Sequence, residues 1–160
     1  DNTFESATSV PQFVTADVGM LIRRVFRHDQ VSSPPIAYQG LPQAEYIYST
    51  QNNGQTWVSQ LAPAKVGTVH YLNTTVGWFL GKSDADPPKS TQLYQTSDSG
   101  KNWVQIDANS PLPLGSEIQF IDQQFGFAFV PFTLSTYYSG LDSRSNRPPY
   151  VFVTRDGGKT

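Results

Sequence analysis

Thr96-Ser97-Asp98-Ser99-Gly100-Lys101-Asn102-Trp103 is the stretch that decides the fold, because the same pattern occurs three times in the chain. An earlier copy covers residues 50–57 and a later one covers residues 154–160. The common form is Thr-x-Asp/Asn-x-Gly-x-x-Trp, and each copy follows a short apolar run that contains an aromatic residue. Repetition at intervals of roughly 20–50 residues predicts an architecture built from one repeated supersecondary unit.

Each copy has the chemistry of a hairpin turn. An apolar strand runs into a polar corner, where the Asx side chain can accept hydrogen bonds from backbone N–H groups two or three residues further on. The glycine permits a positive φ, and the tryptophan begins the return strand. We therefore expect a structural role for the repeated positions, which are Thr50, Asn52, Gly54, Trp57, Thr96, Asp98, Gly100, Trp103, Thr154, Asp156 and Gly158. The alternative for the aspartates is a metal or catalytic role.

A second motif precedes each corner, at residues 13–21, 71–79 and 120–128. It reads as a strand that ends in an aromatic residue, a polar turn, a glycine and a second apolar strand. Each repeat therefore supplies two hairpins, or four short antiparallel strands, which is the composition of one propeller blade. We place the blades at about residues 11–66, 67–114 and 115–160 of one domain, with residues 1–10 as a lead-in or as a strand that completes a neighbouring blade.

The two motifs together resemble the Asp-box (bacterial neuraminidase, BNR) repeat, and most closely the propellers of the photosystem II stability/assembly-factor-like family. The resemblance covers residues 11–160. It implies an all-β fold, a partial β-propeller of about three four-stranded antiparallel blades with Asp-box hairpins. It does not imply a photosynthetic role, because Asp-box propellers also include sialidases, sortilin-type receptors and xyloglucan hydrolases.

Composition narrows the classes of function. The chain has no cysteine, 13% aromatic residues and a formal net charge of -2, so we expect no disulfide, no thiolate metal site and no nucleic-acid partner. The longest apolar run, around residues 125–134, contains a proline and is too short to span a bilayer. The polar, lysine-poor composition favours a secreted or cell-envelope protein. The chain starts without Met, which we interpret as processing or trimming.

Length differences between the repeats fall in the connections between the second and third strands of each blade, which we call the B–C loops. In an up-and-down blade these loops emerge on the face opposite the Asp-box corners. Loops on a rigid scaffold usually carry binding, so we expect the binding face there. Arginines beside tyrosines can hold a carboxylate or stack on a sugar or peptide. The candidate binding residues are Arg23, Arg27, Tyr137, Tyr138, Arg144 and Arg147; the alternative is solvated loops without a ligand.

The sequence offers little support for catalysis. A sialidase needs an arginine triad and a Tyr–Glu pair, but Glu117 is expected at the start of a strand, without an evident Tyr partner. Asp84 and Asp86 are candidates for a glycosidase pair or an oxygen-ligand metal site, yet two acids beside Pro-Pro also form an ordinary solvated turn. His28 and His70 have no nucleophile motif nearby. We expect neither a metal nor a cofactor.

Three blades are fewer than the four to eight of a closed propeller. We therefore expect that the chain is part of a longer propeller or that copies associate. The function predicted is a non-catalytic scaffold that recognises a protein, peptide or glycan through its B–C loops. The alternative is part of a carbohydrate-active enzyme, sialidase-like or glycoside-hydrolase-like, whose catalytic residues are completed outside these residues.

Overall fold

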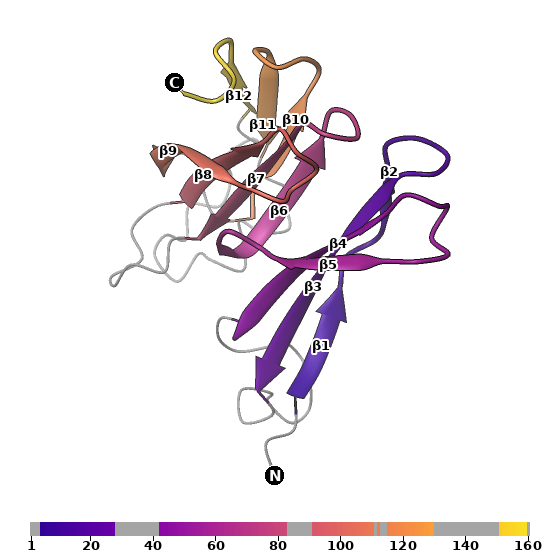
Figure 1. Cartoon of the computed structure of the whole chain (residues 1–160). Helices are drawn as coiled ribbons and strands as arrows, with labels where there is room; N and C mark the ends of the chain where they lie inside the picture. The colour runs from indigo at the N-terminus through magenta and orange to yellow at the C-terminus, as the bar shows by residue number, and fades with distance from the viewer. Residues whose placement is uncertain are drawn as a thin grey trace.

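The computed structural model describes residues 4–27, 42–82, 91–110, 112, 115–129 and 151–159. All regular structure in these residues is β-strand, arranged as three antiparallel sheets (Figure 1). The all-β prediction is confirmed. In chain order the strands are β1 Phe4–Thr8, β2 Gln12–Phe13, β3 Gly19–Arg27, β4 Ala44–Thr50, β5 Val58–Leu61, β6 Lys65–Tyr71, β7 Gly77–Lys82, β8 Thr91–Thr96, β9 Val104–Ser110, β10 Glu117–Phe120, β11 Gly126–Phe129 and β12 Val151–Thr154.

The first sheet has the order β1-β3-β4-β5, and β2 also pairs with β3. Thr8 is opposite Arg23 and Gln12 is opposite Met20, so the inner strand carries one extra residue between these pairs. Pro11, which has no N–H, lies in this interruption. We expected residues 1–10 to be a lead-in or a strand that completes a neighbouring blade, but residues 4–8 have neither role. They form part of the first sheet, which begins at Phe4 and not near residue 11.

The second sheet has the order β6-β7-β8-β9, and the third has the order β10-β11-β12. In both, each strand pairs with its sequence neighbour, as hairpin connections require. The inner strand of the second sheet also contains an irregularity, between Lys65 and Thr68. Val66 lies inside it with a φ of 54°, a left-handed conformation that is rare for a β-branched residue.

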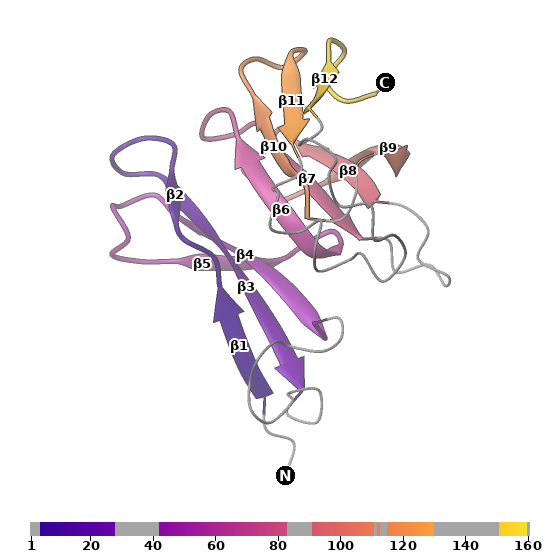
Figure 2. The same ribbon diagram turned by 180° about the vertical axis from the view of Figure 1, so that it is seen from behind.

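Two apolar layers hold the three sheets together. The first lies between sheets one and two and includes Met20, Ile22 and Ile47 from one side and Tyr71 and Phe79 from the other. The second lies between sheets two and three. Its buried members are Val76, Trp78, Leu80, Leu93, Ile118, Phe120 and Ala128. Because side chains alternate across a strand, the second sheet contributes one face to each layer. Figures 1 and 2 show it lying between the other two sheets.

A glycine begins the second long strand of each sheet because an aromatic ring lies directly over it. A Cβ added at Gly77 would fall 2.6 Å from the ring of Tyr71. The corresponding approach at Gly126 is 2.5 Å from the ring of Phe120. No side chain fits at such distances, so the spacing of aromatic residue and glycine in the second motif reflects ring-on-backbone packing.

Candidate functional site

A cavity of about 500 Å³ lies among the inner strands of all three sheets. Its wall includes Gln12 from β2, Arg24 from β3, Gly67 from β6 and Glu117 from β10. It also includes Phe26 near the end of β3, Pro42 just before β4 and Thr91 at the start of β8. These last residues flank the B–C loops in the chain, whereas Gln12 and Met20 lie near the opposite ends of the strands, so the cavity wall extends along the strands.

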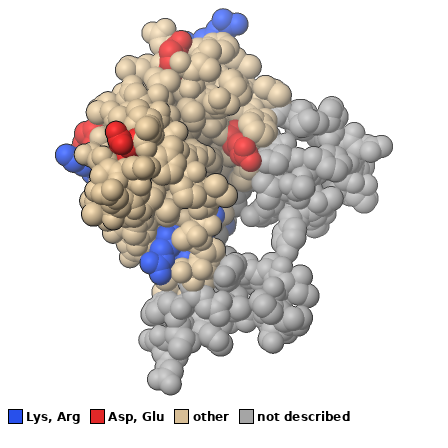
Figure 3. Space-filling view, turned by 90° about the vertical axis from the view of Figure 1, so that its right-hand side faces the viewer, with Lys and Arg blue, Asp and Glu red and all other residues tan. Residues whose placement is uncertain are grey.

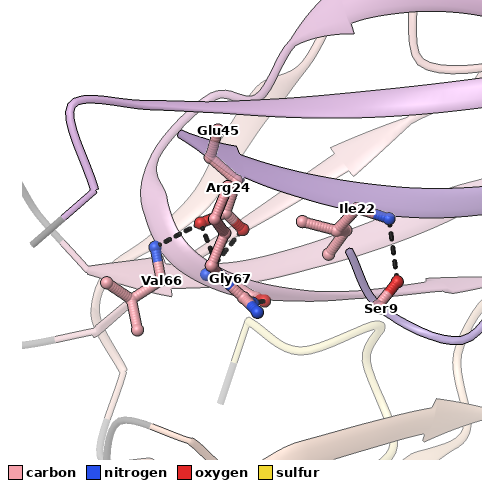
Figure 4. A network of polar contacts seen from close by, with 6 residues as sticks. All are labelled: Ser9, Ile22, Arg24, Glu45, Val66 and Gly67. Atoms are coloured by element: carbon pink, nitrogen blue, oxygen red, sulfur yellow. Dashed lines mark hydrogen bonds and ion pairs between the residues drawn. The ribbon is translucent and has the colours of Figure 1, made fainter. Parts of the chain in front are cut away.

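One wall of the cavity is built around a buried carboxylate (Figure 4). Glu45 on β4 is 1% exposed, and its Oε2 accepts a hydrogen bond from Val66 N at 2.7 Å. Its Oε1 accepts from Gly67 N at 2.9 Å. Arg24 donates from Nε to Glu45 Oε2 at 3.1 Å and from Nη2 to the Gly67 carbonyl oxygen at 2.6 Å. The irregular start of β6 is thereby fastened to the first sheet.

Burial raises the pKa of Glu45 above its ordinary value. The Arg24 guanidinium and the N–H groups of Gly67 and Val66 offset part of that effect. A charge in this position needs every one of these partners, because a buried ion is costly when left incompletely paired. Glu45 is therefore occupied in joining two sheets, and its geometry does not suit a general acid or base.

Sequence reasoning missed the Glu45–Arg24 pair. The signal was present: Glu45 has the same strand parity as the buried Ile47, so its side chain faces the neighbouring sheet. Arg24 is opposite Glu45 in the β3–β4 register. A glutamate at an inward position of a strand needs a cationic or N–H partner, and the strand register places the cation, Arg24, beside Glu45.

The candidate binding residues are only partly described. Arg23 is exposed on β3, on the face opposite Arg24, and it does not line the cavity. Arg27 is the last residue of β3. Tyr137, Tyr138, Arg144 and Arg147 lie outside the described residues, as do Asp84, Asp86 and His28. The structure therefore places Arg24, and not Arg23, at the cavity.

The Asp-box corners are closed by side-chain oxygens that accept backbone N–H groups. Asp98 Oδ1 accepts from Asn102 N at 2.9 Å, and Asn52 Oδ1 accepts from Thr56 N at the same distance. Asp156 Oδ1 accepts from Lys159 N at 3.0 Å. The Asx oxygen therefore accepts from the N–H four residues further along the chain in two corners and three residues further in the last. The sequence predicted a separation of two or three residues. The preceding threonine hydroxyl in each corner accepts from the glycine N–H, as in Gly100 N to Thr96 Oγ1 at 2.9 Å.

Each corner uses two consecutive residues with positive φ. Ser99 and Gly100 have φ values of 67° and 85°, and Asn53 and Gly54 have values of 55° and 80°. The positive φ of the glycine was predicted, and that of the preceding residue was not. The preceding residue also donates its N–H to the neighbouring turn of the same sheet, as Ser99 N does to Thr75 O at 2.9 Å. The two turns at that end of a sheet are thus bonded to each other.

The tryptophans that end the corners differ in their polar contacts. Trp57 Nε1 donates to Gly54 O at 3.0 Å. Trp103 instead packs edge-on against Tyr71, with ring centroids 6.1 Å apart, and its buried Nε1 has no acceptor among the described residues.

The hydrogen bonds of Asn102 lower the pKa of Asp98, and the backbone N–H groups of Phe125 and Gln124 lower that of Asp122. These carboxylates are occupied by their own turns.

The described residues contain no group of three or more His, Asp or Glu side chains arranged to hold a metal ion. His70, on β6, donates from Nε2 to the Phe120 carbonyl oxygen at 3.0 Å and so joins sheets two and three. Glu117 lies at the start of β10, as expected, and its side chain is exposed. The described part of the chain contains no helix with the length and apolar character needed to cross a membrane.

No family model matches the chain, and no curated protein sequence matches it. One solved structure that resembles it is described as YCF48 bound to D1 peptide. The TM-score is 0.50 with 17% sequence identity, and the match covers 100% of this chain and 42% of that one. The chain has the fold of a β-propeller. It spans less than half the length of this structural neighbour. Its three sheets are propeller blades, and the inner strands β2, β6 and β10 each contribute residues to the cavity wall.

Proposed function

We propose that this propeller is a non-catalytic binding module that recognises a segment of another protein on the face of its B–C loops, with the central cavity as part of the site. The cavity carries the proposal: its volume of about 500 Å³ falls within the range of ligand sites, and its wall includes Phe26, Pro42 and Thr91, which flank the loops in the chain. The neighbour of the same fold is described as bound to a peptide.

The chemistry of the cavity favours an extended peptide. Its wall combines apolar side chains such as Val10 and Phe26 with polar ones such as Gln12 and Glu117. The charged residues among those that line the cavity are Arg24 and Glu117. On the described part of the face in Figure 3, charged side chains are also few. A mostly neutral, mixed surface suits a peptide, which offers alternating side chains and backbone groups. A glycan is the second ligand class, for which the stacking aromatics Tyr137 and Tyr138 in the third B–C loop are the candidates.

The carbohydrate-active alternative has no specific observation in its favour among the described residues. Its candidate acids Asp84 and Asp86 lie outside them. The polar, lysine-poor composition supports a further proposal, that the protein works outside the cytoplasm or in the cell envelope.

The test is selection of peptides from a random phage-displayed library on the purified chain, followed by affinity measurement with the selected peptides. Val10, which is 83% exposed, lines the cavity, and Val58, which is 62% exposed, does not. We expect Val10→Trp to weaken peptide binding about tenfold or more and Val58→Trp to leave it unchanged. Neutralising Arg144 and Arg147 tests the loops in the same assay. Failure to enrich any peptide, or equal loss in both Trp variants, contradicts the proposal. A parallel glycan array tests the second ligand class.

A further inference from the structure

The first Asp-box corner contains the pair Asn53-Gly54, and the residue equivalent to Asn53 is Ser99 in the second corner and Gly157 in the third. An asparagine followed by a glycine is chemically distinctive. Glycine has no side chain to hinder its own main-chain nitrogen from approaching the carboxamide of the preceding residue. The pair occurs once in the sequence.

The carboxamide of Asn53 is available for reaction. Its side chain is exposed, and no hydrogen bond joins it to another side chain or to the main chain within the described part of the chain. Two other asparagines of the corners are held in place. Asn52 Oδ1 accepts from Thr56 N at 2.9 Å, and its Nδ2 donates to Thr56 Oγ1 at 2.9 Å. Asn102 Nδ2 donates to Asp98 Oδ2 at 2.7 Å.

The main-chain N–H next to this carboxamide is restrained by the corner. Gly54 N donates to Thr50 Oγ1 at 3.0 Å, and Thr50 is 1% exposed. Asn53 N donates to the Asp17 carbonyl oxygen at 2.9 Å. Attack on the carboxamide requires the Gly54 nitrogen to lose its proton and to turn toward Asn53 Cγ. The corner has to open first, so the reaction is slowed by the fraction of time that the corner spends closed.

We propose that Asn53 is a site of spontaneous deamidation, with water as its co-reactant, and that the hydrogen bond from Gly54 N to Thr50 controls the rate. The Gly54 nitrogen gives its proton to solvent base and forms a bond to Asn53 Cγ. The Cγ–Nδ2 bond breaks, and the departing nitrogen takes up a proton and leaves as ammonia. Water then opens the five-membered imide at either carbonyl, which yields aspartate or isoaspartate at position 53. Neither step transfers electrons.

The modification acts on the corner in which it occurs. Isoaspartate adds one carbon to the main chain between two residues whose φ values are 55° and 80°. The N–H groups of Asn53 and Gly54 then no longer keep their acceptors, Asp17 and Thr50. The two turns at that end of the first sheet therefore separate. The corner does not require asparagine at this position, because Ser99 makes the equivalent bond between turns in the second blade.

The experiment follows position 53 of the 160-residue chain by proteolysis and mass spectrometry during incubation in warm, mildly alkaline buffer. Thr50→Val removes the acceptor of the Gly54 N–H. Thr96→Val is the matched control, since it removes the same acceptor in the second corner, where Gly100 N donates to Thr96 Oγ1 at 2.9 Å. Asn53→Ser removes the carboxamide and introduces the side chain that the second corner has at this position.

We expect slow conversion at position 53 of the natural chain, and conversion about tenfold faster or more when the chain is unfolded in urea. Thr50→Val should accelerate conversion about fivefold, the factor that corresponds to one neutral hydrogen bond, whereas Thr96→Val should leave the rate unchanged. Asn53→Ser should show no mass change at position 53. Conversion of the folded natural chain at the unfolded rate overturns the proposal. Equal effects of Thr50→Val and Thr96→Val overturn it too, as does the absence of conversion in the folded Thr50→Val chain while the unfolded chain converts.

Amide hydrogen exchange at Gly54 of the natural chain gives a second measurement, which needs no variant. Exchange and deamidation both pass through the opened corner, so folding should slow them by the same factor relative to the unfolded chain. Circular dichroism shows whether Thr50→Val remains folded. If it does not, the exchange comparison decides, and two unequal factors overturn the proposal.

Discussion

Glu45 holds Val66 in a left-handed backbone conformation across the boundary between two blades. The φ of Val66 is 54°, and its N–H donates to Glu45 Oε2 at 2.7 Å. A left-handed conformation costs an L-residue about 1–2 kcal/mol, and it persists only where the surroundings enforce it. The carboxylate, with its second hydrogen bond from Gly67 N, supplies that enforcement.

Removing the carboxylate is expected to be costly. Glu45→Ala leaves Arg24 without its anion and leaves two backbone N–H groups, those of Val66 and Gly67, without acceptors. Breaking a buried pair by deleting one partner typically costs about 3–5 kcal/mol. Urea unfolding at neutral pH measures the loss. A change below about 1 kcal/mol would show that water replaces the carboxylate without penalty.

The pKa of Glu45 predicts a specific pH dependence. Because burial raises the folded-state pKa, the stabilising contribution of this group is full below its unfolded value and is lost as pH rises through the folded value. Glu45→Gln cannot titrate at this position. We expect the difference in unfolding free energy, natural chain minus Glu45→Gln, to fall as pH rises from about 4 toward neutrality. A constant difference over this range would contradict the raised pKa.

His70 is expected to change stability with pH in the opposite direction to Glu45. Burial lowers the pKa of His70, and the hydrogen bond to the Phe120 carbonyl offsets part of the shift. A lowered folded-state pKa gives stability that is present above the unfolded value of about 6.5 and is lost as pH falls through the folded value. His70→Gln keeps a donor for Phe120 but does not titrate. The natural chain is therefore expected to lose more stability than His70→Gln between about pH 7.5 and pH 5. Parallel curves would show that His70 does not contribute.

Substitutions at Gly54 and Gly100 distinguish the cost of backbone strain from the cost of steric contact. Both have positive φ, at 80° and 85°. A Cβ at Gly54 would meet nothing closer than 3.7 Å, whereas at Gly100 it would lie 2.5 Å from the Tyr71 hydroxyl. Gly54→Ala should cost about 1–2 kcal/mol through φ alone, and Gly100→Ala should cost clearly more. Denaturant unfolding of both variants measures this, and equal losses would mean that Tyr71 moves aside freely.

The Asp-box corners use two interchangeable pairs of side chains. Asp98 Oδ2 accepts from Asn102 Nδ2 at 2.7 Å, while Asn52 Nδ2 donates to Thr56 Oγ1 at 2.9 Å. Asp98→Asn alone sets two amide donors against each other, so we expect a lower melting temperature. Asp98→Asn combined with Asn102→Thr recreates the first corner and should recover much of the loss. Failure of the double variant to recover would show that the negative charge itself is required.

The sequence by itself determined the local structure of this protein. An Asx, a glycine and flanking apolar runs produce the same corner wherever they occur, since the hydrogen bonds that close it join residues at most four positions apart. Repetition of that corner at residues 50–57, 96–103 and 154–160 was enough to predict hairpins, their pairing within sheets and the all-β fold.

Only the tertiary structure decided what happens between the sheets. Glu45 looked like an isolated acid until β6 brought the N–H groups of Val66 and Gly67 to it from about twenty residues away in the chain. The pairing of β1 with β3 was likewise invisible, because residues 4–8 carry no motif. The aromatic residues at equivalent positions of the three blades also differ in burial, since Tyr71 and Phe120 are buried and Phe13 is exposed. Burial depends on the neighbour that packs against a side chain, and no short stretch of sequence contains that neighbour.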